Sequence, residues 1–354
     1  MIVVLIMAGV LWGFGAVLRA PTKARVGMIG ALWLGVIALH YALPDRHPLR
    51  MATGEDARIW LVLGGLAAVG AAYFAGIRRL KPKPAAPVLA PTKTFRPAEL
   101  DRYARHIMLR EIGGPGQGKL KAARVLVIGA GGLGSPALLY LAAAGVGTIG
   151  VIDDDVVEGS NLQRQIIHAD QRIGMAKVQS AAQAMTALNP FIEVRPYRRR
   201  LTQEIAADLI ADYDLVLDGS DNFDTRYLVN STCSTLGKPL ISGAITQWEG
   251  QLSLFDPAQG SPCYECIFPV RPAPGMVPSC AEAGVAAPLP GVIGAMMAME
   301  TVKHITGAGQ TLSGRLMIHD ALFAETRVIA VKRRADCAVC GSIAGLASRA
   351  PDLQ

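Results

Sequence analysis

Charged residues are scarce in this chain of 354 residues: they make up 18% of it, whereas hydrophobic residues make up 51%. This composition excludes a disordered protein, and one ordinary soluble domain does not account for it. Cysteine is scarce as well, because six cysteines in a chain of this length are too few for a disulfide-stabilised scaffold. The sequence must therefore contain apolar segments beyond those of a normal folded core.

Acidic residues are nearly absent from the first part of the chain. Residues 1–97 carry 12 Lys and Arg against 3 Asp and Glu, whereas residues 98–354 carry 23 against 25. A nucleic-acid-binding protein would place its basic residues on the folded domain, but here they flank apolar segments. The positive charge therefore indicates orientation in a membrane, and no nucleic-acid partner is expected.

Three apolar runs lack Asp, Glu, Lys and Arg altogether: residues 2–18, 26–43 and 59–77. A bilayer core about 30 Å thick needs about 20 apolar residues per helix, so each run is able to span it, the first only just. We predict a transmembrane anchor over residues 1–78. The basic first loop and the basic stretch after the third run place the N-terminus outside and the large C-terminal part in the cytoplasm, as a multi-pass protein of the inner, or cytoplasmic, membrane. Two alternatives stay open, a signal peptide at residues 2–18 and helices of a soluble core.

Proline is concentrated in the segment that follows. Residues 79–97 contain five prolines among basic residues, which is typical of a stiff, extended linker. The linker would join the anchor to a folded domain over residues 98–345, with residues 346–354 as a tail.

Residues 123–155 predict a βαβ unit: a short apolar strand, a glycine turn, an alanine-rich helix and a second strand that ends in acid. Gly129, Gly131 and Gly134 have the G-x-G-x-x-G spacing, which allows a tight turn, close approach of the backbone to a phosphate and tight helix packing. Asp153, at the end of the second strand, is placed to accept hydrogen bonds from ribose hydroxyls.

Further apolar strands at 215–217 and 239–245, with a hairpin-like stretch at 251–256, fit the same sheet. We predict an α/β fold with a Rossmann-like, mostly parallel sheet and helices on both faces. By itself the glycine turn fits NAD, FAD, S-adenosylmethionine or ATP, or an empty Rossmann turn.

Cationic residues follow closely after the ribose acid, namely Arg164 in the N-L-Q-R-Q motif and Lys177. Hydride transfer does not need such a cluster, whereas an ATP triphosphate under in-line attack does. Asp221 follows a later strand, and carboxylates beyond the carboxyl ends of parallel strands face one crevice, where Asp221 suits Mg²⁺. The alternatives are surface ion pairs for the two cations and a helix N-cap for Asp221.

The cysteines form two C-x-x-C pairs, Cys263 with Cys266 and Cys337 with Cys340. Two such pairs in a cytoplasmic domain close one tetrahedral four-thiolate site, which predicts structural zinc rather than a redox pair. Cys280 is different because it falls in a proline-rich loop, residues 269–290, that is able to cover the nucleotide crevice. Cys233 is expected in the core.

The sequence resembles the MoeB/ThiF/HesA family, bacterial relatives of ubiquitin-activating enzymes, from about residue 96 to 341. The resemblance rests on eight motifs in order, besides the two cysteine pairs: R-Y-x-R-H at 102–106, E-I-G-G-x-G-Q at 111–117, G-A-G-G-L-G-S at 129–135, D-D-D-x-V-E at 153–158, N-L-Q-R-Q at 161–165, D-N-F-x-T-R-Y at 221–227, S-G-A-I at 242–245 and S-C-A-E-A-G-V at 279–285.

The resemblance implies an activity. In this family, ATP adenylates the C-terminal glycine carboxylate of a small ubiquitin-like sulfur-carrier protein ending in Gly-Gly, and pyrophosphate is released. The motifs resemble the molybdopterin-synthase enzyme, which serves molybdenum cofactor biosynthesis, slightly more than the thiamine enzyme. No rhodanese-like domain follows residue 341, so a separate sulfur-donor protein is expected. An NAD-dependent oxidoreductase and a non-enzymatic membrane scaffold are the alternatives.

The resemblance also assigns roles to single residues. Gly132 lies under the phosphates, Asp153 binds the ribose, Lys177 clamps the phosphates and Asp221 holds Mg²⁺, with Asn222 in contact with the nucleotide. Arg105 reaches into the partner subunit's site, which implies a homodimer. Cys280 corresponds to a cysteine that is covalently active in some members and only a loop residue in others. The strip along the triphosphate consists of Ser160, Asn161, Leu162, Gln163 and Arg164.

Overall fold

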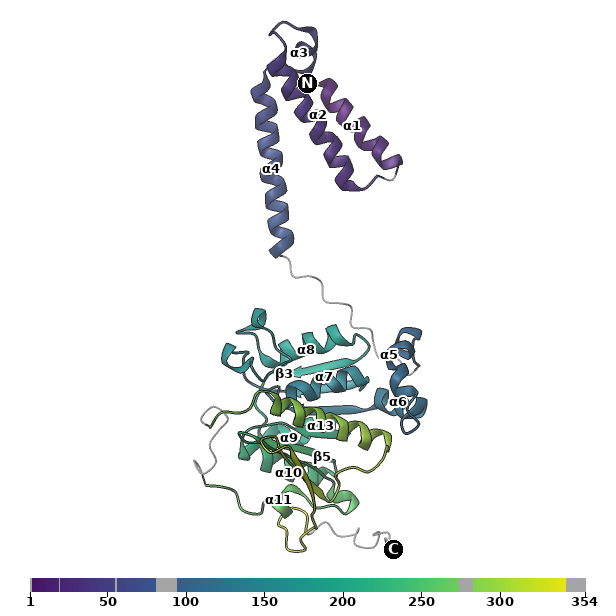
Figure 1. The fold of residues 1–354 in the computed structure, drawn as a ribbon, viewed down its shortest axis with the longest axis vertical. Helices are drawn as coiled ribbons and strands as arrows, with labels where there is room; N and C mark the ends of the chain where they lie inside the picture. The colour runs from purple at the N-terminus through teal and green to yellow at the C-terminus, as the bar shows by residue number, and fades with distance from the viewer. Residues whose placement is uncertain (1, 19, 55, 81–93, 274–282, 342–354) are drawn as a thin grey trace. The chain divides into compact units, whose positions relative to one another are not determined.

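The computed structural model describes residues 2–18, 20–54, 56–80, 94–273 and 283–341 (Figure 1). The chain divides into two compact units, Met1–Ala85 and Ala86–Gln354. Most of the predicted linker and the predicted tail lie outside the described residues.

Four helices form the N-terminal unit: α1 (Ile2–Val17), α2 (Thr22–Ala42), α3 (Pro48–Thr53) and α4 (Ala57–Leu80). Each of the three apolar runs is therefore helical. Val4, Val36 and Trp60 form a small buried cluster. The Trp33 indole packs against Gly64, where a Cβ would collide with the ring, and Trp33 Nε1 donates a hydrogen bond to Trp60 O over 2.9 Å.

Most large apolar side chains of the described part of this unit are exposed, among them Leu5, Leu34, Leu66 and Val69. By length and composition, the segments Thr22–Ala42 and Pro48–Tyr73 would be able to cross a membrane, whereas Ile2–Val17 is shorter. Two such helices are weak evidence for a membrane protein, because the core helix of a soluble protein or a signal sequence meets the same criterion. The helices are found, and their placement in a membrane stays a prediction.

The C-terminal unit contains an eight-stranded sheet in the order β3-β2-β1-β4-β5-β6-β7-β8. Strands β1 to β5 are parallel to one another, and the pairs β5–β6, β6–β7 and β7–β8 are antiparallel. The predicted Rossmann-like, mostly parallel sheet is thus confirmed, and the hairpin-like stretch forms β6. The strands are β1 (Arg124–Ile128), β2 (Thr148–Ile152), β3 (Glu193–Tyr197), β4 (Leu215–Asp218), β5 (Leu240–Ile245), β6 (Glu249–Phe255), β7 (Arg315–Asp320) and β8 (Glu325–Ala330).

Helices cover both faces of this sheet (Figure 1). α7 (Gly134–Ala144), α8 (Lys177–Leu188) and α13 (Pro288–Thr306) share one apolar cluster with Val125 and Val127 of β1. Leu126 and Ile128 of β1 belong to a second cluster, with α9 (Gln203–Ala211) and α10 (Phe223–Leu236). Successive side chains of a strand point to opposite faces, so a strand covered on both sides is apolar at consecutive positions, as β1 is from Val125 to Ile128.

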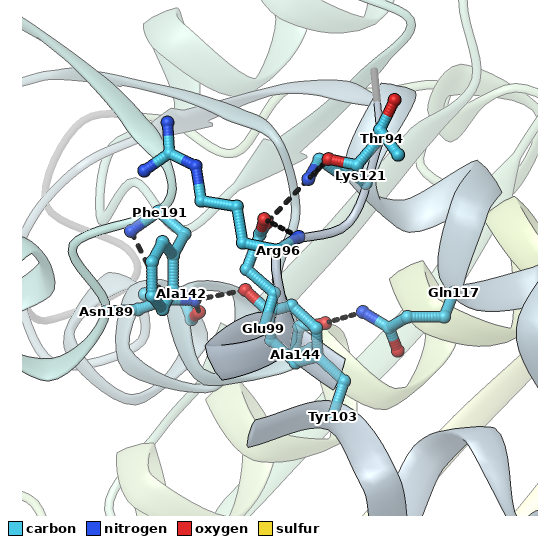
Figure 2. Close-up of polar contacts among 10 residues, drawn as sticks. All are labelled: Thr94, Arg96, Glu99, Tyr103, Gln117, Lys121, Ala142, Ala144, Asn189 and Phe191. Carbon is cyan, nitrogen blue, oxygen red and sulfur yellow. Dashed lines mark hydrogen bonds and ion pairs between the residues drawn. The ribbon is translucent and has the colours of Figure 1, made fainter. Parts of the chain in front are cut away.

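The start of this unit is held by a polar network around α5 (Pro97–Ile107), which packs beside α6 (Gly113–Ala122) (Figure 2). The buried Glu99 pairs with Lys121 Nζ over 2.6 Å, and the same amine donates to Thr94 O. Asn189 Nδ2 donates to Tyr103 Oη and to the carbonyl of Ala142 near the end of α7. The chain is consequently fixed to the domain from Thr94 onward.

Candidate active site

A cleft of about 950 Å³ opens at the carboxyl ends of the parallel strands. It lies where β1 separates β2 from β4, the place at which open α/β sheets bind ligands, and its volume suits a nucleotide-sized molecule. Eight of the residues predicted for the site line it: Gly129, Gly131, Gly132, Asp153, Arg164, Lys177, Asp221 and Asn222.

The glycine loop forms one wall of the cleft, between β1 and α7. Gly129 has φ +90°, a conformation that favours glycine, and a Cβ on Gly134 would lie 1.9 Å from the Gly129 carbonyl oxygen. At Gly132 a Cβ would approach Pro290 of α13 to 3.1 Å. The three glycines therefore let α7 begin directly at the cleft, where its N-terminus is suited to binding an anion.

Asp153 binds the loop in addition to facing the cleft. Its Oδ2 accepts a hydrogen bond from Ala130 N over 2.8 Å, and its Oδ1 accepts one from Asp155 N over 2.9 Å. Burial raises the pKa of this carboxyl, against the opposing effect of the two N–H donors and of Lys177. Each carboxylate oxygen is able to accept a further bond, so the geometry leaves room for ribose hydroxyls.

Lys177 stands at the first position of α8, where only 5% of it is exposed. Its Nζ lies 2.7 Å from Oδ2 of the exposed Asp155. The ion-pair alternative is thus correct in part, but the ammonium group is buried in the wall of the cleft. The carboxylates of Asp153, Asp154 and Asp155 gather within 4.8 Å, a grouping that the sequence analysis did not assign beyond Asp153.

Arg164 is oriented by the strip that precedes it. Its guanidinium donates to Asn161 Oδ1 over 2.8 Å, and within the described part of the chain it forms no ion pair. Ser160 and Asn161 lie on the short 3-10 helix Gly159–Asn161, followed by Leu162 and Gln163. None of these four lines the cleft, whereas Arg164 and the buried Gln165 do. The strip therefore places an arginine and an unpredicted glutamine beside the glycine loop.

Asp221 and Asn222 follow β4, but not directly. The strand ends at Asp218, so Asp221 lies in the loop and its side chain is exposed to the cleft. Asn222 is the N-cap of α10, because its Oδ1 accepts a hydrogen bond from Thr225 N over 2.9 Å. The N-cap alternative thus applies to Asn222 and leaves Asp221 available to a ligand.

A buried ion pair beneath the cleft escaped the sequence analysis. Asp218 and Arg226 are 1% and 7% exposed, and their nearest charged atoms lie 3.7 Å apart. Ser220 N and Ser242 Oγ donate to the Asp218 carboxylate, and Arg226 donates to the carbonyl of Gly243. In the sequence, Arg226 is visible only as part of the D-N-F-x-T-R-Y motif. The motif does not reveal that the Arg226 side chain contacts Asp218 of β4 and Gly243 of β5.

The sequence analysis also singled out Arg105 and Cys280. Arg105 is exposed on α5 and does not line the cleft of its own subunit. Cys280 lies outside the described residues. Arg199 and Arg200, after β3, line the cleft on the side of Asp153 and were not predicted.

The four cysteines of the two C-x-x-C pairs come together as predicted. Cys263 and Cys266 lie at α11 (Tyr264–Ile267), and Cys337 and Cys340 lie in the segment after β8. All four are buried, and the Sγ atoms are 3.9 Å apart in the first pair and 3.5 and 3.4 Å apart between the pairs. Four thiolates at about 2.3 Å from one zinc ion lie about 3.8 Å from one another, so this donor set fits structural zinc. Cys233 is buried in the core, as expected.

Comparisons with known proteins agree with this geometry. The chain is 50% identical over 247 residues to a sulfur carrier protein adenylyltransferase of Thermus thermophilus, covering 69% of this chain and 91% of that protein. It is 46% identical over 250 residues to the SAMP-activating enzyme E1 of Haloferax volcanii, covering 71% and 92%. Identity to the adenylyltransferase and sulfurtransferase MOCS3 of Bos taurus is 46% over 274 residues, covering 77% of this chain and 60% of that protein.

Solved structures show the same fold at lower identity. A crystal structure of MccB from E. coli bound to MccA-N7isoASN superimposes with a TM-score of 0.61 at 24% identity, covering 68% of this chain and 74% of that one. The crystal structure of PaaA gives a TM-score of 0.59 at 21% identity, covering 82% and 92%. The model of the ThiF family matches residues 103–339. Together with the relatives of 46–50% identity, this match shows that the chain belongs to the ThiF family.

Proposed function

We propose that this protein uses ATP to adenylate the C-terminal carboxylate of a small ubiquitin-like sulfur-carrier protein, with release of pyrophosphate. The observation that carries the proposal is one cleft in which a glycine loop, a ribose-side acid and two cations meet, in a chain half identical to a named sulfur carrier protein adenylyltransferase. The cleft supports the binding of a nucleotide, and the similarity to the Thermus enzyme supports a sulfur-carrier protein as the acceptor.

The chemistry requires an anion to attack another anion. A carboxylate oxygen of the carrier forms a bond to the α-phosphorus of ATP, the bond from that phosphorus to the bridging oxygen breaks, and pyrophosphate leaves. Arg164 and Lys177 offset the charge of the phosphates, and the N-terminus of α7 adds partial positive charge. No side-chain general base is needed, because a carboxyl group is already ionised at pH 7.

Lys177 has to change partners when the nucleotide binds. Before binding, its ammonium group is neutralised by Asp155 over 2.7 Å. Because Asp155 is exposed, its carboxylate is able to swing into solvent at little cost and leave the buried cation to a phosphate. Lys177 thus acts as a preplaced charge that needs no reorganisation of α8.

The donor atoms present fit the two metals that the fold implies. Asp221 offers an exposed hard oxygen ligand in the same cleft as the phosphate-binding loop, and it would hold Mg²⁺, which offsets phosphate charge when bound. Cys263, Cys266, Cys337 and Cys340 would hold zinc and tie the segment after β8 to α11.

The carrier that we propose is the small subunit of molybdopterin synthase, ending in Gly-Gly, for molybdenum cofactor biosynthesis. The thiamine-pathway carrier is the alternative, and the name of the Haloferax relative points to a further class of carrier. A separate protein would donate the sulfur. For Cys280, which lies outside the described residues, the two candidate roles stay a covalent acceptor and a residue of a covering loop.

A homodimer completes the proposal. Arg105 is exposed and does not line the cleft of its own subunit. Large apolar side chains of the same unit are exposed as well: Met108 after α5 (75%), Tyr140 on α7 (58%) and Met299 on α13 (61%). A symmetric interface would bury such side chains and bring Arg105 to the partner's cleft.

We further propose that the N-terminal unit anchors the enzyme in the cytoplasmic membrane with the catalytic unit in the cytoplasm. Supporting this, helices α1, α2 and α4 expose apolar side chains that water would not favour, and basic residues flank them. Fractionation of cells that produce the full chain tests this: recovery in the membrane fraction after a carbonate wash is expected, and recovery in the soluble fraction would contradict it.

The activity is tested by carrier-dependent exchange of pyrophosphate into ATP, with the full-length protein in detergent. Purified molybdopterin and thiamine carriers are compared with the same carriers lacking the last glycine. Exchange with the intact molybdopterin carrier, abolished by the truncation, is expected. Exchange with the thiamine carrier alone would change the pathway, and exchange with neither would contradict the proposed acceptors.

A further inference from the structure

His168 lies behind the glycine loop, where 8% of it is exposed, and it has no role in the catalytic scheme above. One ring nitrogen, Nε2, lies 2.9 Å from the carbonyl oxygen of Ala130, between the first two glycines of the loop. The other, Nδ1, lies 2.9 Å from the hydroxyl oxygen of Ser180 on α8. The imidazole therefore bridges the glycine loop and the helix that begins with Lys177.

The hydrogen bonds fix which nitrogen carries the proton. A carbonyl oxygen only accepts hydrogen bonds, so Nε2 must donate to Ala130, and Nδ1 of the neutral ring then accepts from the Ser180 hydroxyl. Burial lowers the pKa of His168, and the nearby positive charges of Lys177 and Arg172 act in the same direction. The neutral ring is thus the stable form around pH 7.

The consequence for the loop follows from the planarity of the peptide bond. In a trans peptide the carbonyl oxygen of one residue and the N–H of the next point in opposite directions. The peptide joining Ala130 to Gly131 has its oxygen held by His168, so the Gly131 N–H is directed away from His168. Gly131 lines the cleft, and within the described part of the chain its N–H has no hydrogen-bond partner.

The amide group on the other side of Ala130 is held as well. Ala130 N donates to Asp153 Oδ2 over 2.8 Å, so both polar groups of this residue are bound by side chains rather than by other backbone. Flanking glycines leave the backbone free to rotate, and these two bonds remove that freedom. A donor that is already oriented costs nothing to position when the phosphate arrives.

We propose that His168 is a positioning residue for ATP: by holding the carbonyl of Ala130, it turns the Gly131 N–H into the cleft as a phosphate donor. This inference rests on the proposed use of ATP, and it adds a residue outside the cleft lining that acts through the loop. Asp153, which follows β2, and His168, from the segment before α8, bind the two polar backbone groups of Ala130.

The test compares variants of the full-length protein in detergent. His168→Leu removes both hydrogen bonds, whereas His168→Gln keeps an N–H donor near the position of Nε2. His304→Leu is the matched control, because His304 is also a shielded histidine, on α13 about 21 Å along the helix from Pro290 at the glycine loop. Two quantities are measured: the Kd for ATP without carrier, and KM and kcat in carrier-dependent exchange.

We expect His168→Leu to raise Kd and KM for ATP roughly tenfold while the KM for the carrier changes less than about twofold. His168→Gln should recover most of the ATP affinity, and His304→Leu should bind ATP as the unaltered protein does. A folded His168→Leu protein with unchanged Kd for ATP would overturn the inference, and so would a His168→Gln protein as weak as His168→Leu.

If His168→Leu does not fold, Ser180→Ala decides, since it keeps the ring but removes the partner of Nδ1. A roughly threefold rise in Kd for ATP is expected from this variant, and unchanged affinity would overturn the inference. Failure of the proposed function is distinguishable: it would leave the unaltered protein without carrier-dependent exchange, while the Kd values for ATP still decide the role of His168.

Discussion

The cysteine cluster and the nucleotide cleft belong to the same unit, and each joins residues far apart in the chain. The four sulfur atoms are buried beside one another, and Cys266 Sγ also accepts a hydrogen bond from Arg334 N, so the cluster is closed to a substrate. In the cleft, Asp155 and Asp221 are exposed, and the buried Lys177 is neutralised by a carboxylate that solvent reaches. The sulfur atoms are thus shielded from ligands in solution, whereas the charged side chains of the cleft are able to exchange their present partners for a ligand.

This difference separates stability from activity. A closed four-thiolate site contributes its metal-binding free energy to folding. A charged group in the cleft instead lowers the stability of the fold. Burial raises the pKa of the Asp153 carboxyl, so its ionised form destabilises the folded protein at pH 7. Substitutions at the cysteines should therefore act on folding, and substitutions in the cleft on turnover.

The largest expected effect is on the closed site. Cys337→Ser removes one of the four thiolates that we propose to hold zinc, so we expect loss of the metal and a fall in Tm of roughly 10 °C or more. Elemental analysis and thermal unfolding measure the two quantities. Cys233→Ala is the control, since this buried cysteine lies outside the cluster and its removal should leave the zinc content unchanged. Full zinc content in Cys337→Ser would contradict the four-thiolate assignment.

The opposite behaviour is expected in the cleft. Arg164→Ala removes a cation that we propose to bind phosphate and whose only described partners are Asn161 and Ser160, so exchange should fall by roughly 10²- to 10³-fold while Tm changes little. Arg327→Ala, an exposed arginine on β8 paired with Glu325, is the matched control and should keep full activity. Turnover at the unaltered rate in Arg164→Ala would remove this residue from the mechanism.

The smallest effect is a dependence of stability on pH. Burial lowers the pKa of His168 and of His304, so the folded protein binds fewer protons than the unfolded chain as the pH falls below the usual histidine value near 6.5. The free energy of unfolding should therefore decrease between pH 7.5 and 5.5, as measured by urea denaturation. His304→Leu should show a shallower decrease, and an equal slope in both proteins would refute the contribution of His304.

Several features were predictable because the chemistry depends on spacing along the chain. Gly129, Gly131 and Gly134 occupy one turn, and each C-x-x-C pair lies within a single short segment, so local geometry already limits what they are able to do. The buried strands were also recognisable from local sequence, because a strand covered on both faces is a continuous run of apolar residues. The three apolar helices followed from their length and lack of charge.

The tertiary structure decided which polar residue faces which partner. Sequence reasoning assigned Asp221 to the end of a strand, but β4 ends at Asp218, which is buried against Arg226 from the following helix. It also did not assign His168, because a histidine among apolar neighbours gives no sign that a carbonyl from a loop 38 residues earlier lies behind it. The sequence by itself determined the fold class, the glycine turn and the two C-x-x-C pairs, because each of these depends on short-range spacing. The orientation of the loop and the ion pair beneath it were decided by packing, because their partners meet only when distant strands and helices come together.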